Sequence, residues 1–246
     1  MLRHLSLLLC GLLLPLATVT SQARADILPP GGSYAGRTYN DWQVLWWQAA
    51  FAAPIVDGDH PLFSGGSLGR YDGVVLLTGI GGGAHLDLTI SADTAIFVPI
   101  VNIESSVYED PPFHGDDDES LRENSVKLLD ETTGLFAEID GVPVDDLASY
   151  RFISPSFTFG PLPPGNLLNA PVGTTSLSVD AGYYLLLTPL SVGTHTLHFG
   201  GINDAVGSSI DTTYTITVVP EPASLTMLAI AGLGSMVYRR RGRAQR

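Results

Sequence analysis

The side chains in this sequence that are best suited to chemistry are carboxylates gathered in two short acidic turns. These turns are Asp57-Gly58-Asp59 and the run Asp116-Asp117-Asp118-Glu119. Carboxylate oxygens are the hard ligands that Ca²⁺ prefers, so the candidate calcium ligands are Asp57, Asp59, Asp116, Asp117 and Asp118. Neither turn has the twelve-residue spacing of an EF-hand, and the pattern favours solvated acidic turns over a calcium site.

Two glycine motifs suggest catalysis or cofactor binding, but the segments around them do not fit. The run Gly65-Gly66-Ser67-Leu68-Gly69 matches the G-x-S-x-G elbow of hydrolases. That elbow needs a helix after the serine, whereas the strand-like run 74–78 follows, so we expect a glycine-rich loop. The run 79–84 matches the G-x-G-x-x-A dinucleotide motif. A strand-like segment follows where a phosphate-binding helix is required, so we expect a hairpin loop.

The histidine pair His195 and His198 has a spacing that argues against a shared metal. Residues three apart on a strand point to opposite faces of the sheet. We therefore expect two half-buried or surface histidines and not a zinc site.

All three tryptophans lie on one predicted helix that runs from Asn40 to Ala53. Asn40 and Gln43 have the spacing of a capping box, and Pro54 ends the run. Trp42 and Trp46 belong to an apolar stripe with helical periodicity, which favours burial against a sheet.

Trp47 lies off this stripe, so it is the best candidate for exposure. Together with Tyr39, it is a candidate ligand-binding residue, because exposed aromatic rings can stack on sugars. A second helix is predicted from Asp117 to about Glu131, with acids in its first turn and Lys127 near its end.

The rest of the sequence reads as short strands separated by turns. Apolar or alternating runs predict strands at 74–78, 86–90, 95–101, 135–139, 157–159, 183–187, 195–199 and 213–218. Asp140-Gly141 predicts a tight hairpin turn. We therefore predict a mainly β fold, an antiparallel β-sandwich with one or two helices. Residues 26–219 have the length of one secreted domain, or of two small ones.

The charge of this central region excludes several partners. Residues 26–219 contain 5 basic and 24 acidic residues, a formal charge of −19. A body this acidic cannot replace the counterions of a nucleic acid, and it is a poor partner for an anionic membrane surface.

The N-terminus reads as a signal peptide covering residues 1–25. A basic start at Arg3 precedes an apolar run, and Ala23-Arg24-Ala25 has the small-x-small pattern of a cleavage site. We expect export through the Sec machinery and cleavage by signal peptidase after Ala25. Cleavage there would remove Cys10, the one cysteine. The mature body would then have neither a disulfide nor a thiolate metal site.

The C-terminus has three parts in a fixed order over residues 220–246. Pro220-Glu221-Pro222 comes first, an apolar stretch of residues 223–238 follows, and Arg239, Arg240 and Arg241 begin a basic tail. Sixteen helical residues span about 24 Å, short of the ~30 Å hydrocarbon core, so this is a marginal membrane anchor. Its basic tail would stop in the cytoplasm.

This C-terminal segment closely resembles the bacterial PEP-CTERM sorting signal. The resemblance implies recognition by an exosortase, removal of the tail near Pro220-Glu221-Pro222, and delivery from an inner-membrane intermediate to the cell surface or extracellular matrix. It also implies a link with exopolysaccharide and biofilm. The body resembles uncharacterised secreted bacterial proteins with a Trp-rich first helix and a late G-Y-x-L-L-L-x-P-L-x-x-G-x-H segment, here Gly182 to His195. That second resemblance implies no activity.

Three hypotheses for the body remain open. The leading one is a non-enzymatic, exosortase-processed surface or matrix protein. The second is a carbohydrate-binding module that uses Trp47 or Tyr39, with or without stabilising Ca²⁺. The third is a secreted hydrolase that uses scattered acids such as Asp57, Asp72 or Glu104. A sequence cannot reveal such a pair, because catalytic carboxylates need only be close in space.

Overall fold

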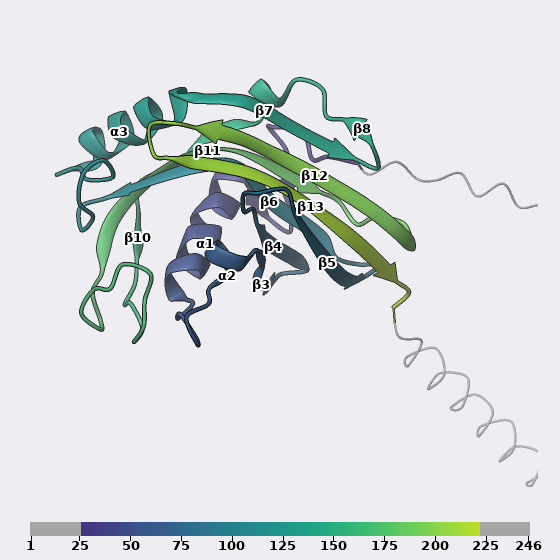
Figure 1. Ribbon diagram of the computed structural model, residues 1–246, viewed down its shortest axis with the longest axis horizontal. Helices are drawn as coiled ribbons and strands as arrows, with labels where there is room; N and C mark the ends of the chain where they lie inside the picture. Colours follow the sequence, from purple (N-terminus) through teal and green to yellow (C-terminus); the bar gives the residue numbers. More distant parts are fainter. Residues whose placement is uncertain (1–25, 222–246) are drawn as a thin grey trace, which may run out of the picture.

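The computed structural model describes residues 26–221. The predicted signal peptide with Ala23 and Ala25, and the predicted C-terminal helix with Pro222 and Arg239–Arg241, lie outside these residues. The described chain contains short and long strands, two α-helices of three turns or more, and two single-turn helices (Figure 1). In chain order the elements are β1 (Ser33–Tyr34), β2 (Arg37–Thr38), α1 (Tyr39–Ala52), α2 (Pro61–Ser64), β3 (Gly66–Tyr71), β4 (Val74–Thr78), β5 (Ala84–Ser91), β6 (Ala95–Ser106), α3 (Asp118–Asp130), β7 (Thr132–Ile139), β8 (Val142–Pro143), the 3-10 turn η1 (Leu147–Tyr150), β9 (Arg151–Ile153), β10 (Phe157–Phe159), β11 (Ser176–Leu187), β12 (Gly193–Asn203) and β13 (Ser208–Val219).

Two sheets make up the mainly β fold, as predicted. One has the strand order β10-β11-β6-β4-β3, with β9 also paired to β11, and the other has the order β5-β13-β12-β7-β8. The prediction of a purely antiparallel sandwich needs one correction. The pairs β4–β6 and β13–β5 are parallel. In each pair the two strands are separated along the chain by at least one strand of the other sheet.

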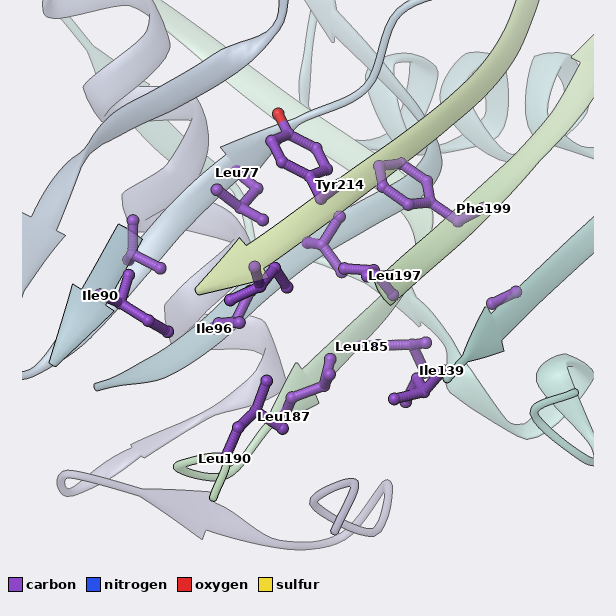
Figure 2. Close-up of a cluster of buried hydrophobic side chains, with 14 of the residues drawn as sticks. Leu77, Ile90, Ile96, Ile139, Leu185, Leu187, Leu190, Leu197, Phe199 and Tyr214 are labelled. Carbon is purple, nitrogen blue, oxygen red and sulfur yellow. The ribbon is translucent and has the colours of Figure 1, made fainter. Parts of the chain in front are cut away.

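The main core lies between the two sheets (Figure 2). Leu77, Ile96 and Leu185 from the first sheet face Leu197 and Tyr214 from the second. These residues come from strands in which every second side chain points to the same face, so each sheet supplies an apolar inner layer. Each Å² of apolar surface that this layer removes from water stabilises the fold by roughly 25 cal/mol.

Helix α1 covers the outer face of the six-stranded sheet. It begins one residue before the predicted Asn40, and its capping box is formed by Thr38 and Asp41 and not by Asn40 and Gln43. Thr38 has extended backbone angles, and its side chain accepts a hydrogen bond from Asp41 N. The helix therefore starts at the pair Thr38 and Asp41, which precedes the predicted pair and has the same spacing. Trp42 and Trp46 are buried against the sheet, as their periodicity predicts.

The other predicted elements are largely confirmed. Helix α3 begins after Asp117, whose side chain caps it. Asp140 and Gly141 both have positive φ, as a two-residue hairpin turn between β7 and β8 requires.

Both loop predictions for the glycine motifs need correction. Residues 66–71 form β3, an irregular strand whose register shifts between Ser67 and Arg70. Residues 79–83 do not close a hairpin, because they carry the chain from β4 in one sheet to β5 in the other. Neither motif opens a helix, so neither has the geometry that a hydrolase elbow or a dinucleotide site requires.

Within residues 26–221, the helices are too short and too polar for any of them to cross a bilayer. The predicted membrane helix falls outside this range.

Candidate functional site

A groove made of three adjoining cavities runs beside the C-terminal half of α1. The middle cavity, of about 310 Å³, is lined by Trp47, Phe51, Leu62, Asn102, Ile103, Glu104, Glu109, Phe113, Leu167, Leu168, Val206 and Ser208. A second cavity of about 380 Å³ shares Trp47, Leu62, Asn102 and Ser208 with it. A third, of about 430 Å³, shares Glu109 and Leu168. These volumes are in the range of small-ligand sites.

The central strands β6 and β11 bring the polar residues of the groove to one face. In their antiparallel register, Glu104 lies opposite Asp180 and Asn102 opposite Gly182. The register of the two strands shifts between Tyr183 and Tyr184 of β11, which lie opposite the part of β6 that comes before Asn102. Val101 and Ile103 pack on the opposite face, against α3, so Asn102 and Glu104 point toward the α1 side.

Glu104 and Glu109 are neighbouring carboxyls that line the middle cavity together. Glu104 is 4% exposed and accepts a hydrogen bond from Ser178, whereas Glu109 accepts one from Ser106 Oγ at 2.8 Å. Burial, and then the charge of Glu109, raise the pKa of Glu104 well above its ordinary value. Burial also raises the pKa of Glu109. In both residues the environment therefore favours the protonated form of the carboxyl.

Asp180 is a third carboxyl, behind this pair and fully buried. Tyr184 Oη donates to its Oδ2 at 2.5 Å, while Oδ1 has no hydrogen-bond donor. Burial raises the pKa of Asp180 to about 8 and is also the main cause of the raised pKa of Tyr184. Asp180 is therefore mostly protonated at pH 7.

Trp47 forms the aromatic wall of the groove. Its ring is half-buried and stacks on Phe51 with ring centroids 5.5 Å apart. Its indole nitrogen approaches Asp180, and the amide nitrogen of Asn102 approaches the Tyr184 hydroxyl. Neither contact completes a hydrogen bond of normal geometry, so both N–H groups lack an acceptor. The groove thus combines an aromatic face with incompletely satisfied polar groups, as many ligand sites do.

Two of the residues singled out in the sequence meet in this groove, and three do not. Trp47 and Glu104 line the same cavity. Tyr39 is 1% exposed and its hydroxyl bonds Leu28 O and Leu186 N, so the prediction of an exposed Tyr39 is wrong. Asp57 lies in a tight turn, and Asp72 forms an ion pair with Arg37, both away from the groove.

The acids of the predicted calcium turns serve local structural roles. Asp59 accepts the His60 N–H, and Asp117 caps α3. Asp116 contacts His114 at 3.3 Å, and Asp118 pairs with Arg122 at 3.2 Å. Within residues 26–221, no three His, Cys, Asp or Glu side chains come together as a metal site would require. The calcium hypothesis therefore has no ligand set in this part of the chain.

His195 and His198 lie on opposite faces of β12, as predicted. His195, 4% exposed, contacts Asp140 Oδ2 through Nδ1 at 2.8 Å, and Ser191 Oγ lies 3.2 Å from its Nε2. This order of groups resembles a serine–histidine–aspartate triad. However, the Ser191 carbonyl oxygen lies closer to Nε2, at 2.9 Å, and it accepts a hydrogen bond from Nε2–H, so Nε2 has no free lone pair to take the proton of a serine nucleophile. The histidine instead links two loops to the end of β12.

The segment Pro220-Glu221 leaves the body far from the groove. Val206 and Ser208, in the turn between β12 and β13, line the middle cavity. Strand β13 then runs for 12 residues, roughly 36 Å, to the opposite side of the molecule (Figure 1). Pro220 and Glu221 follow β13 directly and are exposed.

The comparisons with known proteins agree with the predicted C-terminal signal. Residues 218–242 match a family described as the PEP-CTERM protein-sorting motif. The chain therefore carries the signal of exported, cell-surface-directed proteins that an exosortase processes. The match begins at Val218 and Val219, so the motif overlaps the last two residues of β13.

The body itself has little similarity to known proteins. No curated protein matches the chain. A solved structure titled "Structure of PbICP-C in complex with falcipain-2" is similar at a TM-score of 0.22 and 8% identity. That match covers 60% of this chain and 98% of the other, and a score this low does not establish a shared fold. The resemblance of the body to secreted bacterial proteins stays a prediction.

Sequence patterns alone did not single out Asn102, Glu109 and Asp180. One signal could have found two of them, because Asn102 and Asp180 are polar residues within long runs that are otherwise apolar or small. Buried strands rarely contain such residues without a functional or structural partner. Glu109 follows the strand in a loop, and only the fold brings it to Glu104.

Proposed function

We propose that the protein is a non-enzymatic surface or matrix protein whose body binds a glycan in the groove beside Trp47. The single observation that carries this proposal is the cavity that the half-buried Trp47 ring lines together with Glu104 and Glu109. Sugar-binding sites combine an aromatic face, which stacks on the ring, with polar groups that bond the hydroxyls. The sorting motif supports a place for that glycan in an exopolysaccharide or biofilm matrix.

The position of the groove supports display at the cell surface. The C-terminal signal follows β13, whereas the groove contacts the turn at the other end of that strand. A body attached through its C-terminus would therefore present the groove away from the attachment point.

The environment of the carboxyls supports binding over hydrolysis. Glycosidases pair a carboxylic acid with a second carboxyl group that stays ionised. Burial raises the pKa of both Glu104 and Glu109, so neither environment favours the ionised form. The Ser191–His195 contact offers no activated nucleophile either, since the Ser191 carbonyl takes the hydrogen bond at Nε2.

A glycan panel tests the proposal. The full chain is expected to bind at least one oligosaccharide, and Trp47→Ala is expected to abolish that binding. Trp47→Phe keeps the packing on Phe51 and is expected to retain part of it, which separates loss of binding from loss of folding. Phe136→Ala, on the outer face of the other sheet, is the matched control and is expected to bind normally. Binding that survives in Trp47→Ala would contradict the proposal.

A further inference from the structure

The groove carries charge of one sign only. Among the described residues that line its three cavities, the acidic side chains are those of Glu104, Glu109 and Asp110, and none of the lining residues is Lys, Arg or His. A cleft lined by one sign of charge focuses the electrostatic potential and attracts ligands of the opposite sign.

The buried carboxyls of the groove have no cationic partner in the described fold. None of the ion pairs within residues 26–221 includes Glu104, Glu109 or Asp180. Burial without a cationic partner disfavours the charged form of a carboxyl, and it raises the pKa of both Glu104 and Glu109. Asp180 is fully buried and its Oδ1 has no donor, so one acceptor in the cluster stays unsatisfied.

A metal ion is a poor candidate for the missing positive charge. Within residues 26–221, no three acidic or histidine side chains approach one point as a metal site requires. An organic cation needs only one or two carboxylates and an apolar face, and a tryptophan ring attracts cations through its π electrons. Trp47 supplies that face in the same cavity as Glu104 and Glu109.

We infer that the groove takes a glycan of amino sugars, whose protonated amine supplies the positive charge that Glu104 and Glu109 lack. This inference rests on the proposed glycan-binding function and names the class of glycan. The sugar ring stacks on Trp47, and the ammonium group lies against the two carboxyls. The ligand charge stabilises both carboxylates, so protons that the carboxyls carry leave to solvent on binding.

Calorimetry with the full chain tests this inference. The probes are oligomers of glucosamine, of N-acetylglucosamine and of glucose, at a pH at which the glucosamine amines are protonated. We expect glucosamine oligomers to bind about tenfold more tightly than the other two, the effect of one charge-assisted hydrogen bond. Measurements in two buffers of different ionisation enthalpy should show that ligand binding releases protons, because the ligand charge lowers the raised pKa values of both carboxyls.

Two matched variants test whether Glu109 causes the preference for glucosamine oligomers. Glu109→Gln keeps the side-chain shape and is expected to lose the tenfold preference while retaining binding of the neutral oligomers. Asp87→Asn removes the same charge from an exposed position on the other sheet and is expected to keep the preference.

The outcomes separate this inference from the function on which it rests. Equal binding of all three oligomers would overturn the amino-sugar inference and leave the proposed glycan binding intact. If the chain binds neither these three oligomers nor any other glycan in the panel, both the inference and the proposed function are overturned. Oligolysine that competes more strongly than the glucosamine oligomers would assign the groove to a cationic peptide and also overturn the inference.

Discussion

Tyr184 reaches back along its own strand to donate a 2.5 Å hydrogen bond to Asp180, four residues earlier. The ring passes over Gly182, where a Cβ atom would lie 2.6 Å from the Tyr184 ring and 2.7 Å from Asn102 Cβ. Because Gly182 has no side chain, the Tyr184 ring has room to make the hydrogen bond that orients the buried carboxyl of Asp180.

Gly182→Ala is expected to destabilise the protein by about 1–3 kcal/mol, because the methyl group forces the Tyr184 ring to move in a packed region. Urea denaturation measures the effect. Gly31→Ala is the control, since a Cβ there meets nothing within 4 Å, and it should change stability by only a few tenths of a kcal/mol. Equal stability of the two variants would show that Tyr184 does not need the space over Gly182.

Asp180 should make the protein less stable as the pH rises from about 4 to about 8. In the unfolded chain this carboxyl loses its proton near its ordinary pKa of 3.8, whereas burial raises the pKa to about 8 in the fold. Unfolding within this window releases a proton, so stability falls by about 1.4 kcal/mol per pH unit for that proton.

The check is a set of thermal or urea unfolding curves across this pH window. Asp180→Asn keeps an uncharged side chain of the same size and should remove about one proton from the slope. Asp87→Asn should leave the slope unchanged. The account of Asp180 would be wrong if the Asp180→Asn variant kept the full pH dependence.

Calcium removal should leave stability unchanged, because the acids of the two predicted turns serve as caps and ion-pair partners. EDTA is expected to cause no shift in the melting temperature. Asp117→Ala, in contrast, should cost about 1 kcal/mol through loss of the α3 cap, and Asp117→Ser should restore most of it. A fall in melting temperature with EDTA that added Ca²⁺ reverses would reinstate the calcium hypothesis.

Ser191 should not react with an active-site serine probe such as a fluorophosphonate. The Ser191 carbonyl lies 2.9 Å from His195 Nε2, which leaves the hydroxyl without a base. Mass spectrometry after exposure to the probe measures labelling. If the probe labels the protein and Ser191→Ala removes that labelling, the protein has a serine nucleophile, and the proposal of a non-enzymatic protein is contradicted.

Glu221→Ala should block removal of the C-terminal tail in the native host. Glu221 is exposed and lies within the matched sorting motif, so its loss removes recognition without touching the packed body. Immunoblotting compares the size and location of the chain with those of a Glu123→Ala control on α3. Unchanged processing of the Glu221→Ala chain would rule out recognition through this residue.

The sequence by itself determined much of the local structure. Periodicity placed α1, α3 and eight of the strands, since helices and strands repeat their apolar residues with different periods. It also predicted burial of Trp42 and Trp46 and named Trp47 as the best candidate for exposure, and this residue is half-buried in the structure. The C-terminal sorting motif was predicted as well, because its residues are contiguous and need no fold to be recognised.

Only the tertiary structure decided which residues form the groove. Glu104, Glu109 and Asp180 are charged residues without a shared motif, and the register of β6 against β11 places Glu104 opposite Asp180. Tyr39 reads as an exposed aromatic residue but is buried, because its hydroxyl finds backbone partners on distant segments. Register and crossing between sheets depend on contacts far apart in the chain, which local periodicity does not encode.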